Sequence, residues 1–285
     1  AIIAVIGLEL APVAANMAGL TGDNINMVNV AISMFTLAVG VIGSVAFRGF
    51  MSIIPILFGV VCGYVFAAIM GIVNFQPVID APWFQVPHFY APVFDINAIM
   101  IIAPAALVVL AEHIGHLVVT GNIVDRDLIK DPGLSRSLFA DGLSNVISGF
   151  AGATPNTTYG ENIGVMAITK VYSTWVIGGA AVMAIILSFC GKLSELIHSI
   201  PVPVMGGICI LLFGVIAASG IRVLVERQVD YSKSSNLVMT SVIMIIGLSG
   251  AKLSFGAFSV QGMVLATVVA IIMSLIFKLF ESLHL

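Results

Sequence analysis

The feature that most constrains this chain is a succession of apolar runs, each long enough to form a helix that crosses a lipid bilayer. A hydrocarbon layer about 30 Å thick needs about 20 apolar residues per helical span, and only 9% of the 285 residues are charged. The runs lie at residues 1–20, 29–47, 51–73, 97–120, 135–152, 171–191, 201–220, 235–250 and 258–280, with a shorter run that starts polar at 159–170. This pattern predicts an all-α polytopic membrane protein and excludes a soluble domain or a disordered chain.

The distribution of Lys and Arg predicts the orientation of these spans. When ten spans are threaded alternately through a bilayer, every basic residue except Lys192 and Lys252 falls on one side. Cytoplasmic loops keep an excess of basic residues, so we expect a cytoplasmic C-terminus and an extracellular position for the acidic, proline-rich loop 74–96. The net charge of −3 offers no basic surface to nucleic acid. Because the chain begins inside an apolar run and without Met, we expect a fragment that lacks the N-terminal part of a longer protein.

Three ionisable residues, Glu112, His113 and His116, lie inside a predicted span, where a charge is costly and usually marks a pathway. Glu112 and His116 are four residues apart and share one helix face, whereas His113 is turned about 100° away from Glu112. One alternative is an ordinary polar pair that packs this span against its neighbour. Another is a zinc site, since His113 and His116 are one helical turn apart, but the sequence offers no third ligand nearby.

The stretch 148–170 predicts a broken span. Gly149 and Pro155 disfavour a helix in its first part, and a helix is expected to begin near Thr158. Broken backbone at membrane depth is tolerated only where it is buried in protein or lines a cavity, and discontinuous helices often carry transporter binding sites. The N–H groups at this helix start and the carboxylate of Glu161 offer a ligand both donors and an acceptor. The alternative is a surface loop in which Glu161 caps its own helix.

Glu9 and the cysteines carry weaker signals. Glu9 either lines a path or makes a helix contact through Asn16, and the sequence does not decide between the two. All three cysteines lie in apolar runs, as expected of small buried hydrophobic residues rather than of disulfides or zinc ligands: Cys62, Cys190 and Cys209.

Two carboxylates and a helix start define the ligand chemistry of the candidate site. The carboxylates of Glu112 and Glu161 accept hydrogen bonds from N–H donors or bind cations, and the helix start binds a carbonyl or an anion. A small planar ring with both N–H and C=O groups, such as a nucleobase, satisfies all of these, with Tyr159 or a phenylalanine stacked on it. An amino acid or a sodium-coupled solute also fits. Burial favours the neutral form of a carboxylate, so these two residues and His116 can exchange protons near neutral pH.

Several strings of residues resemble the nucleobase–ascorbate transporter family, over essentially the whole chain. The ten-residue signature of that family is matched at 161–170, by E-N-I-G-V-M-A-I-T-K. Four further strings resemble its uracil-transporting bacterial members: A-E-H-I-G-H-L-V-V-T at 111–120, T-P-N-T-T-Y-G-E-N-I-G-V-M-A-I-T at 154–169, P-V-M-G-G-I at 203–208 and A-A-S-G-I-R-V-L at 217–224. Within the family, Glu rather than Gln at position 161 favours uracil over purines.

The resemblance implies a transporter fold of two inverted seven-span repeats, with a core and a gate domain, of which this chain represents spans five to fourteen. Residues 1–73 are expected to form the first part of the gate and 74–96 an extracellular loop. The second half of the core is expected at 97–199, with a short extended strand in its broken span, and the second part of the gate at 200–285. Family members associate through the gate, which implies a possible homodimer.

The resemblance also implies proton-coupled uptake of uracil across the bacterial cytoplasmic (inner) membrane by alternating access, with the proton as coupling ion and no cofactor. Glu112 and Glu161 are expected to accept hydrogen bonds from uracil N–H groups, and the backbone N–H groups of Gly160 and Tyr159 to bind a uracil carbonyl. His116 and the two carboxylates are expected to couple protonation to substrate binding.

Supporting roles are expected for Thr158, Asn162 and Phe213. Phe213 stands where the family pattern has tyrosine, which puts a gate contact with the core in doubt but leaves the substrate contacts unaffected. The alternatives are a purine permease for xanthine or urate, and an anion transporter or channel that shares the fold. An enzyme is the weakest alternative, because the sequence has no nucleophile elbow, metal constellation or cofactor motif.

Overall fold

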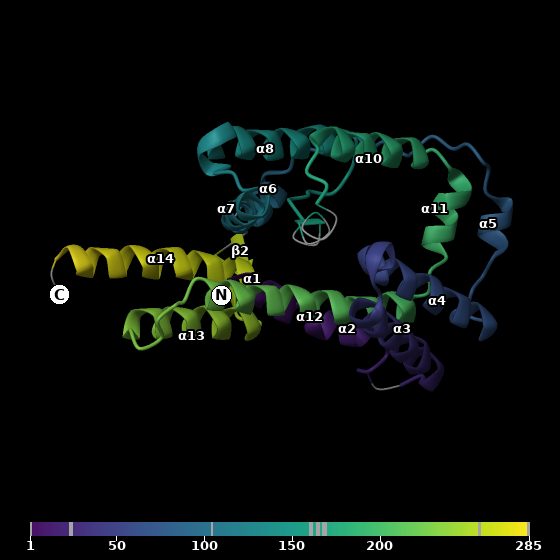
Figure 1. The fold of residues 1–285 in the computed structure, drawn as a ribbon, viewed down its shortest axis with the longest axis horizontal. Coiled ribbons are helices and arrows are strands. Elements are labelled where there is room, and N and C mark those ends of the chain that lie inside the picture. The colour runs from purple at the N-terminus through teal and green to yellow at the C-terminus, as the bar shows by residue number, and fades with distance from the viewer. Residues whose placement is uncertain are drawn as a thin grey trace. The chain divides into compact units, whose positions relative to one another are not determined.

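The computed structural model describes residues 2–22, 25–103, 105–159, 162–163, 166, 170–255 and 258–283. The chain divides into two compact units. Unit 1 comprises Ala1–Ala11, Ala91–Gly160 and Phe213–Leu285, and unit 2 comprises Pro12–Tyr90 and Glu161–Leu212. Helices dominate both units (Figure 1).

Unit 1 contains most of the helices near the two ends of the sequence. It also contains two helices from the middle of the sequence, at 105–124 and 134–150, which contact the broken segment of the candidate site. Its elements are α1 (Ile2–Glu9), α6 (Ile96–Ile102), α7 (Ala105–Val124), the helical turn η2 (Ile129–Gly133), α8 (Leu134–Phe150), the second half of α12 (Val202–Glu226), α13 (Ser234–Leu248), β1 (Lys252–Phe255), β2 (Phe258–Gln261) and α14 (Gly262–Ser282). The two strands form an antiparallel hairpin in which Lys252 pairs with Gln261 and Phe255 with Phe258.

The core of unit 1 joins helices from opposite ends of the sequence. Val5 of α1, Ile243 of α13, and Ala266 and Ala270 of α14 are buried together. Small residues let these helices approach closely, as is common between membrane helices. A Cβ on Gly247 of α13, for example, would collide with the side chain of Val5.

Glu9 also ties the two ends of the chain together. Its carboxylate Oε2 accepts a hydrogen bond of 2.8 Å from the backbone N–H of Met263, in the first turn of α14. Gly262 precedes this amide with a φ of +54°, and a Cβ there would collide with the same carboxylate, so a side chain is excluded at that position. Glu9 therefore makes a helix contact, as one of the two interpretations had it, but the partner is α14 rather than Asn16.

Unit 2 is built from α2 (Ala11–Met17), α3 (Met27–Ala46), the short turn η1 (Gly49–Ile53), α4 (Pro55–Ile69), α5 (Gln76–Asp80), α10 (Thr174–Leu187), α11 (Gly191–His198) and the first half of α12. Ile32 of α3, Ala67 of α4 and Val204 of α12 form its core. Gly63 of α4 packs so closely on Thr36 of α3 that an added Cβ would overlap the threonine side chain.

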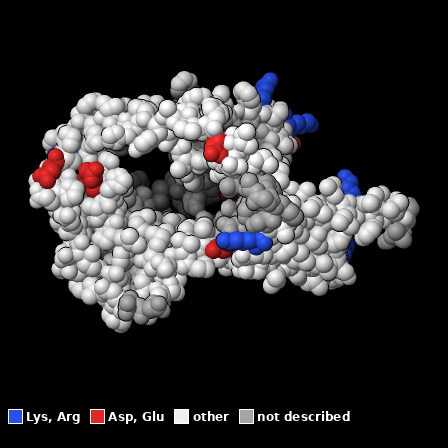
Figure 2. All heavy atoms as spheres, turned by 180° about the vertical axis from the view of Figure 1, so that it is seen from behind, with Lys and Arg blue, Asp and Glu red and all other residues white. Residues whose placement is uncertain are grey.

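Several helices have the length and composition of membrane spans. Within the described part of the chain, four stretches qualify: Met27–Ala46, Ile96–Val124, Val202–Val225 and Gly262–Phe280. A fifth is counted when α10 and α11, bent by 90° at a short break, are taken as one broken span. Apolar side chains are widely exposed, such as Val45 at 83% and Trp175 at 89%, and most of the face in Figure 2 carries no charged side chain. The chain is a multi-pass membrane protein of the all-α class.

Each predicted apolar run outside 159–170 contains a helix, but several helices are shorter than predicted. The first run is divided into α1 and α2, with Pro12 in the first turn of α2. The run predicted at 97–120 is divided between α6 and α7, and the run predicted at 258–280 begins with a strand instead of a helix. The division into core and gate domains stays a prediction, as does the possible homodimer.

Candidate functional site

The fourth predicted span brings Glu112 and His116 together on one face of α7. Their positions one helical turn apart place His116 Nε2 3.9 Å from Glu112 Oε1, with the two side chains 14% and 23% exposed, respectively. This is an ion-pair distance rather than a hydrogen bond. The imidazole and the carboxylate therefore face each other along one side of α7.

The other ring nitrogen of His116 contacts the broken segment. His116 Nδ1 lies 2.7 Å from Thr158 Oγ1, and this hydrogen bond is partly buried. A hydroxyl both donates and accepts, so Thr158 donates to a neutral ring nitrogen and accepts from a protonated one. His116 thus links Glu112 to the segment before the predicted helix start, in either protonation state.

The segment 153–159 is non-helical, as predicted, although the described residues form no paired strand there. It is held on its other side by Asn145 of α8. The Asn145 amide donates to the Asn156 carbonyl (2.9 Å) and accepts from the Asn156 N–H (2.8 Å). The backbone is thus held at Asn156 by α8, and the Thr158 side chain is held by α7.

His113 forms a direct polar contact between α7 and α8. It is only 3% exposed, its Nε2 lies 2.7 Å from Ser137 Oγ, and its Nδ1 lies 4.0 Å from Asp141 Oδ2. The Ser137 contact satisfies Nε2, whereas the buried Nδ1 has no hydrogen-bond partner among the described residues and faces Asp141 only at ion-pair distance. The sequence singled out His113 but not Ser137, Asp141 or Asn145, because polar residues on α8 give no local sign that they face another helix.

The remaining predicted site residues are only partly described. Tyr159 is 62% exposed, and Asn162 is exposed in a short helical stretch. Phe213 is half-buried on α12, where its carbonyl packs against Gly7 of α1. Two further residues, Gly160 and Glu161, lie outside the described residues.

A cavity of about 380 Å³ adjoins Glu112. Apolar side chains, such as Ile6 of α1 and Met239 of α13, form most of its wall, with polar groups from Asn236 and Thr240. The carboxylate of Glu112 therefore borders a space in which a small molecule or water could lie.

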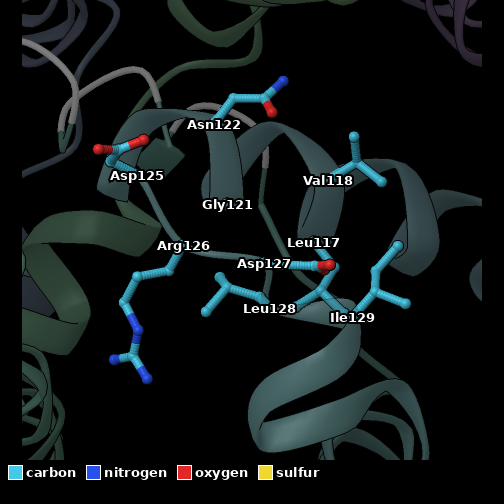
Figure 3. A pocket seen from close by; sticks show the side chains of 9 residues that line it. All are labelled: Leu117, Val118, Gly121, Asn122, Asp125, Arg126, Asp127, Leu128 and Ile129. Atoms are coloured by element: carbon cyan, nitrogen blue, oxygen red, sulfur yellow. The ribbon is translucent and has the colours of Figure 1, made fainter.

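A second cavity, of about 410 Å³, lies at the C-terminal end of α7 and contains none of the predicted site residues. Its wall runs from Leu117 to Ile129 and carries Asp125, Arg126 and Asp127 in the turn after the helix (Figure 3).

The three cysteines are free thiols of intermediate exposure, so they are less buried than the sequence suggested. Among the residues that the structure describes, no group of three or more His, Cys, Asp and Glu side chains is placed to hold a metal ion. Glu112 and His116 form a pair, and His113 faces Ser137 and Asp141 instead of completing a set of ligands with them.

Apolar helices with ionisable residues beside a broken segment are common in membrane transporters. A model of the xanthine/uracil permeases (Xan_ur_permease), described as "Permease family", matches residues 1–256. The chain therefore belongs to this permease family, and the resemblance to nucleobase–ascorbate transporters is confirmed.

Relatives named "Uracil permease" are similar to the chain along its whole length. The protein of Escherichia coli strain K12 is 64% identical over 287 residues, which are 100% of this chain and 67% of that protein. The Paenibacillus larvae protein is 60% identical over 99% of this chain and 69% of its own length. The Bacillus subtilis strain 168 protein is 47% identical over 96% of this chain and 66% of its own length. The chain thus spans about two-thirds of the length of these relatives.

Proposed function

We propose that this protein takes up uracil across the bacterial cytoplasmic membrane together with protons, with its C-terminus in the cytoplasm. The observation that carries the proposal is the position of His116, between the Glu112 carboxylate and the Thr158 hydroxyl. It is supported by the names of relatives up to 64% identical. A proton is the coupling ion in this proposal, and no cofactor takes part.

Binding and protonation are coupled through His116 in this mechanism. With a proton on both ring nitrogens, the imidazolium faces Glu112 through Nε2 and donates from Nδ1 to Thr158. The bond from a charged His116 holds Thr158 more tightly than the bond to a neutral His116 does. It thereby also fixes the segment that continues from Thr158 to Glu161. Uracil then donates its N–H groups to the carboxylates of Glu112 and Glu161, while the backbone N–H groups of Gly160 and Tyr159 bind a carbonyl. Loss of the proton toward the cytoplasm weakens the Thr158 bond and releases the substrate.

The direct test is uptake of radiolabelled uracil by cells that lack their own permease and express the complete protein, with and without a protonophore. Uptake that the protonophore abolishes is expected. Excess unlabelled xanthine is expected to leave the signal unchanged, and excess uracil to remove it. Absence of uracil uptake together with uptake of radiolabelled xanthine would instead assign a purine substrate, and uptake that does not saturate would indicate a channel.

Two variants test the proposed residue roles. Glu161→Gln keeps the shape of the side chain but removes its charge, and uracil binding is expected to weaken by about 1.5–3 kcal/mol, the value of a charged hydrogen bond. Unchanged binding would contradict the role of Glu161. His116→Leu is expected to flatten the pH profile of uptake, and an unaltered profile would exclude His116 from proton coupling.

A further inference from the structure

One side chain on α8, that of Asn145, holds both backbone polar groups of a residue in the broken segment. Its Oδ1 accepts from the Asn156 N–H at 2.8 Å, and its Nδ2 donates to the Asn156 carbonyl at 2.9 Å. The same Nδ2 donates to the carbonyl of Asp141 at 3.0 Å, one turn earlier on α8. All three bonds require one orientation of the amide, with the nitrogen toward the two carbonyls.

This arrangement reproduces the pairing of a β-strand with a single side chain. In an antiparallel sheet, two opposite residues exchange both N–H···O=C bonds, and the Asn145 amide takes the place of the opposite residue. A non-helical segment in a membrane protein must satisfy its N–H and C=O groups within the protein. Asn145 does so at Asn156, in a segment for which the described residues provide no partner strand.

The pairing lies close to the proposed substrate site. Asn156 is three residues before Tyr159, and only Thr157 separates it from Thr158, whose hydroxyl is bonded to His116. The segment is therefore held at two points by two different helices, Asn145 on α8 and His116 on α7.

We infer that Asn145 is a positioning residue, which fixes the backbone at Asn156 so that the following residues present their N–H groups to the substrate. This inference rests on the proposed function, because the substrate at that site is uracil. Ala is too short to reach Asn156. Asp keeps the size and one acceptor, but it loses both donors and turns a carboxylate oxygen toward two carbonyls.

The test compares three variants of the complete protein in detergent: Asn145→Ala, Asn145→Asp and the matched control Ser144→Ala. Ser144 Oγ donates to the same Asp141 carbonyl, at 2.8 Å, so its removal costs α8 a similar bond and leaves the Asn156 bonds intact. Both Asn145 variants are expected to raise the Kd for uracil about tenfold or more, where tenfold corresponds to about 1.4 kcal/mol. Ser144→Ala is expected to leave the Kd within about twofold of the unmodified protein. Thermal unfolding without uracil is expected to be similar in all three.

Hydrogen–deuterium exchange measures the pairing itself, independently of substrate. The Asn156 amide is expected to exchange slowly in the unmodified protein and at least about tenfold faster in Asn145→Ala, whereas amides in the middle of α8 keep their rates. Fast exchange of this amide in the unmodified protein would overturn the inference, even if the Asn145 variants do not fold. An unchanged Kd in both Asn145 variants would also overturn it. If the unmodified protein binds no uracil, the proposed function fails, and the exchange experiment still decides whether Asn145 holds Asn156.

Discussion

The hydrogen bond between His116 and Thr158 provides the sharpest test of the proton-coupling mechanism. Thr158→Val removes the hydroxyl and keeps the shape of the side chain, while Thr158→Ser keeps the hydroxyl and serves as the control. The bond joins Nδ1 and Oγ1 at 2.7 Å in a partly buried position. The mechanism makes it a charged bond in the protonated, uracil-bound state and a neutral bond in the unprotonated, free state.

The magnitude follows from the difference between these two bonds. A hydrogen bond to a charged group contributes about 1.5–3 kcal/mol, and a neutral one about 0.5–1.5 kcal/mol. The variant therefore loses about 1–1.5 kcal/mol more from the bound state than from the free state. This corresponds to a rise of about 5- to 12-fold in the Kd for uracil.

Equilibrium binding of radiolabelled uracil, measured in acid, near neutrality and in alkali, checks this prediction. The ratio of the Kd of Thr158→Val to that of the unmodified protein is expected to reach its full value in the intermediate pH range, where free His116 is neutral and takes up a proton when uracil binds. It is expected to decrease toward one in acid, where the imidazole is charged both before and after binding, and in alkali, where His116 stays neutral in both states. Thr158→Ser is expected to give a ratio near one throughout. A Thr158→Val ratio that is the same across the whole pH range would show that the hydroxyl does not serve a protonated imidazole, and the reasoning would be refuted.

Three further predictions concern packing and stability. Glu9→Ala removes a charged acceptor from the start of α14 and is expected to lower the free energy of unfolding by about 1.5–3 kcal/mol. Glu9→Gln is expected to lower it by about half as much. Equal stability of Glu9→Ala and the unmodified protein in thermal unfolding would contradict this prediction. Gly63→Ala is expected to lower the free energy of unfolding by about 1–3 kcal/mol, because the added methyl group overpacks against Thr36. Combining it with Thr36→Ala is expected to restore most of that stability. If the stability losses of the two single variants simply add in the double variant, the assigned collision is refuted. Lys192 donates from Nζ to two backbone carbonyls of α5, which lies in the loop 74–96. Lys192→Met removes these bonds and is therefore expected to speed proteolysis of that loop. An unchanged cleavage rate would argue that Lys192 does not anchor it.

The positions of the helices could be predicted from the apolar runs. The thickness of the hydrocarbon layer sets the length of a span, and the need to hydrogen-bond every backbone N–H and C=O group within the protein favours a helix. The hairpin of β1 and β2 was missed. Its strands are only four residues long, and K-L-S-F and F-S-V-Q lie beside an apolar run that predicts a helix from 258. So short an alternation does not distinguish a strand from the first turn of a helix.

The candidate site was predictable where its geometry is local. Glu112 and His116 lie one helical turn apart in sequence, so their shared face follows from helix periodicity. The contacts of His116 with Thr158 and of Asn145 with Asn156 depend instead on how α7, α8 and the broken segment pack. The partner of Glu9 was missed for the same reason, since tertiary contacts between distant segments leave no local pattern.

The bond between Glu9 and the start of α14 has a consequence for biosynthesis. The two residues that it joins are 254 positions apart, so ribosomes working at about 5–20 residues per second make Met263 about 13–50 s after Glu9. During that interval α1 enters the membrane with a carboxylate that lacks this amide. An ionisable group in the hydrocarbon region is costly, which favours retention of α1 near the insertion machinery until α14 arrives. A helix made late thus completes the environment of one made much earlier.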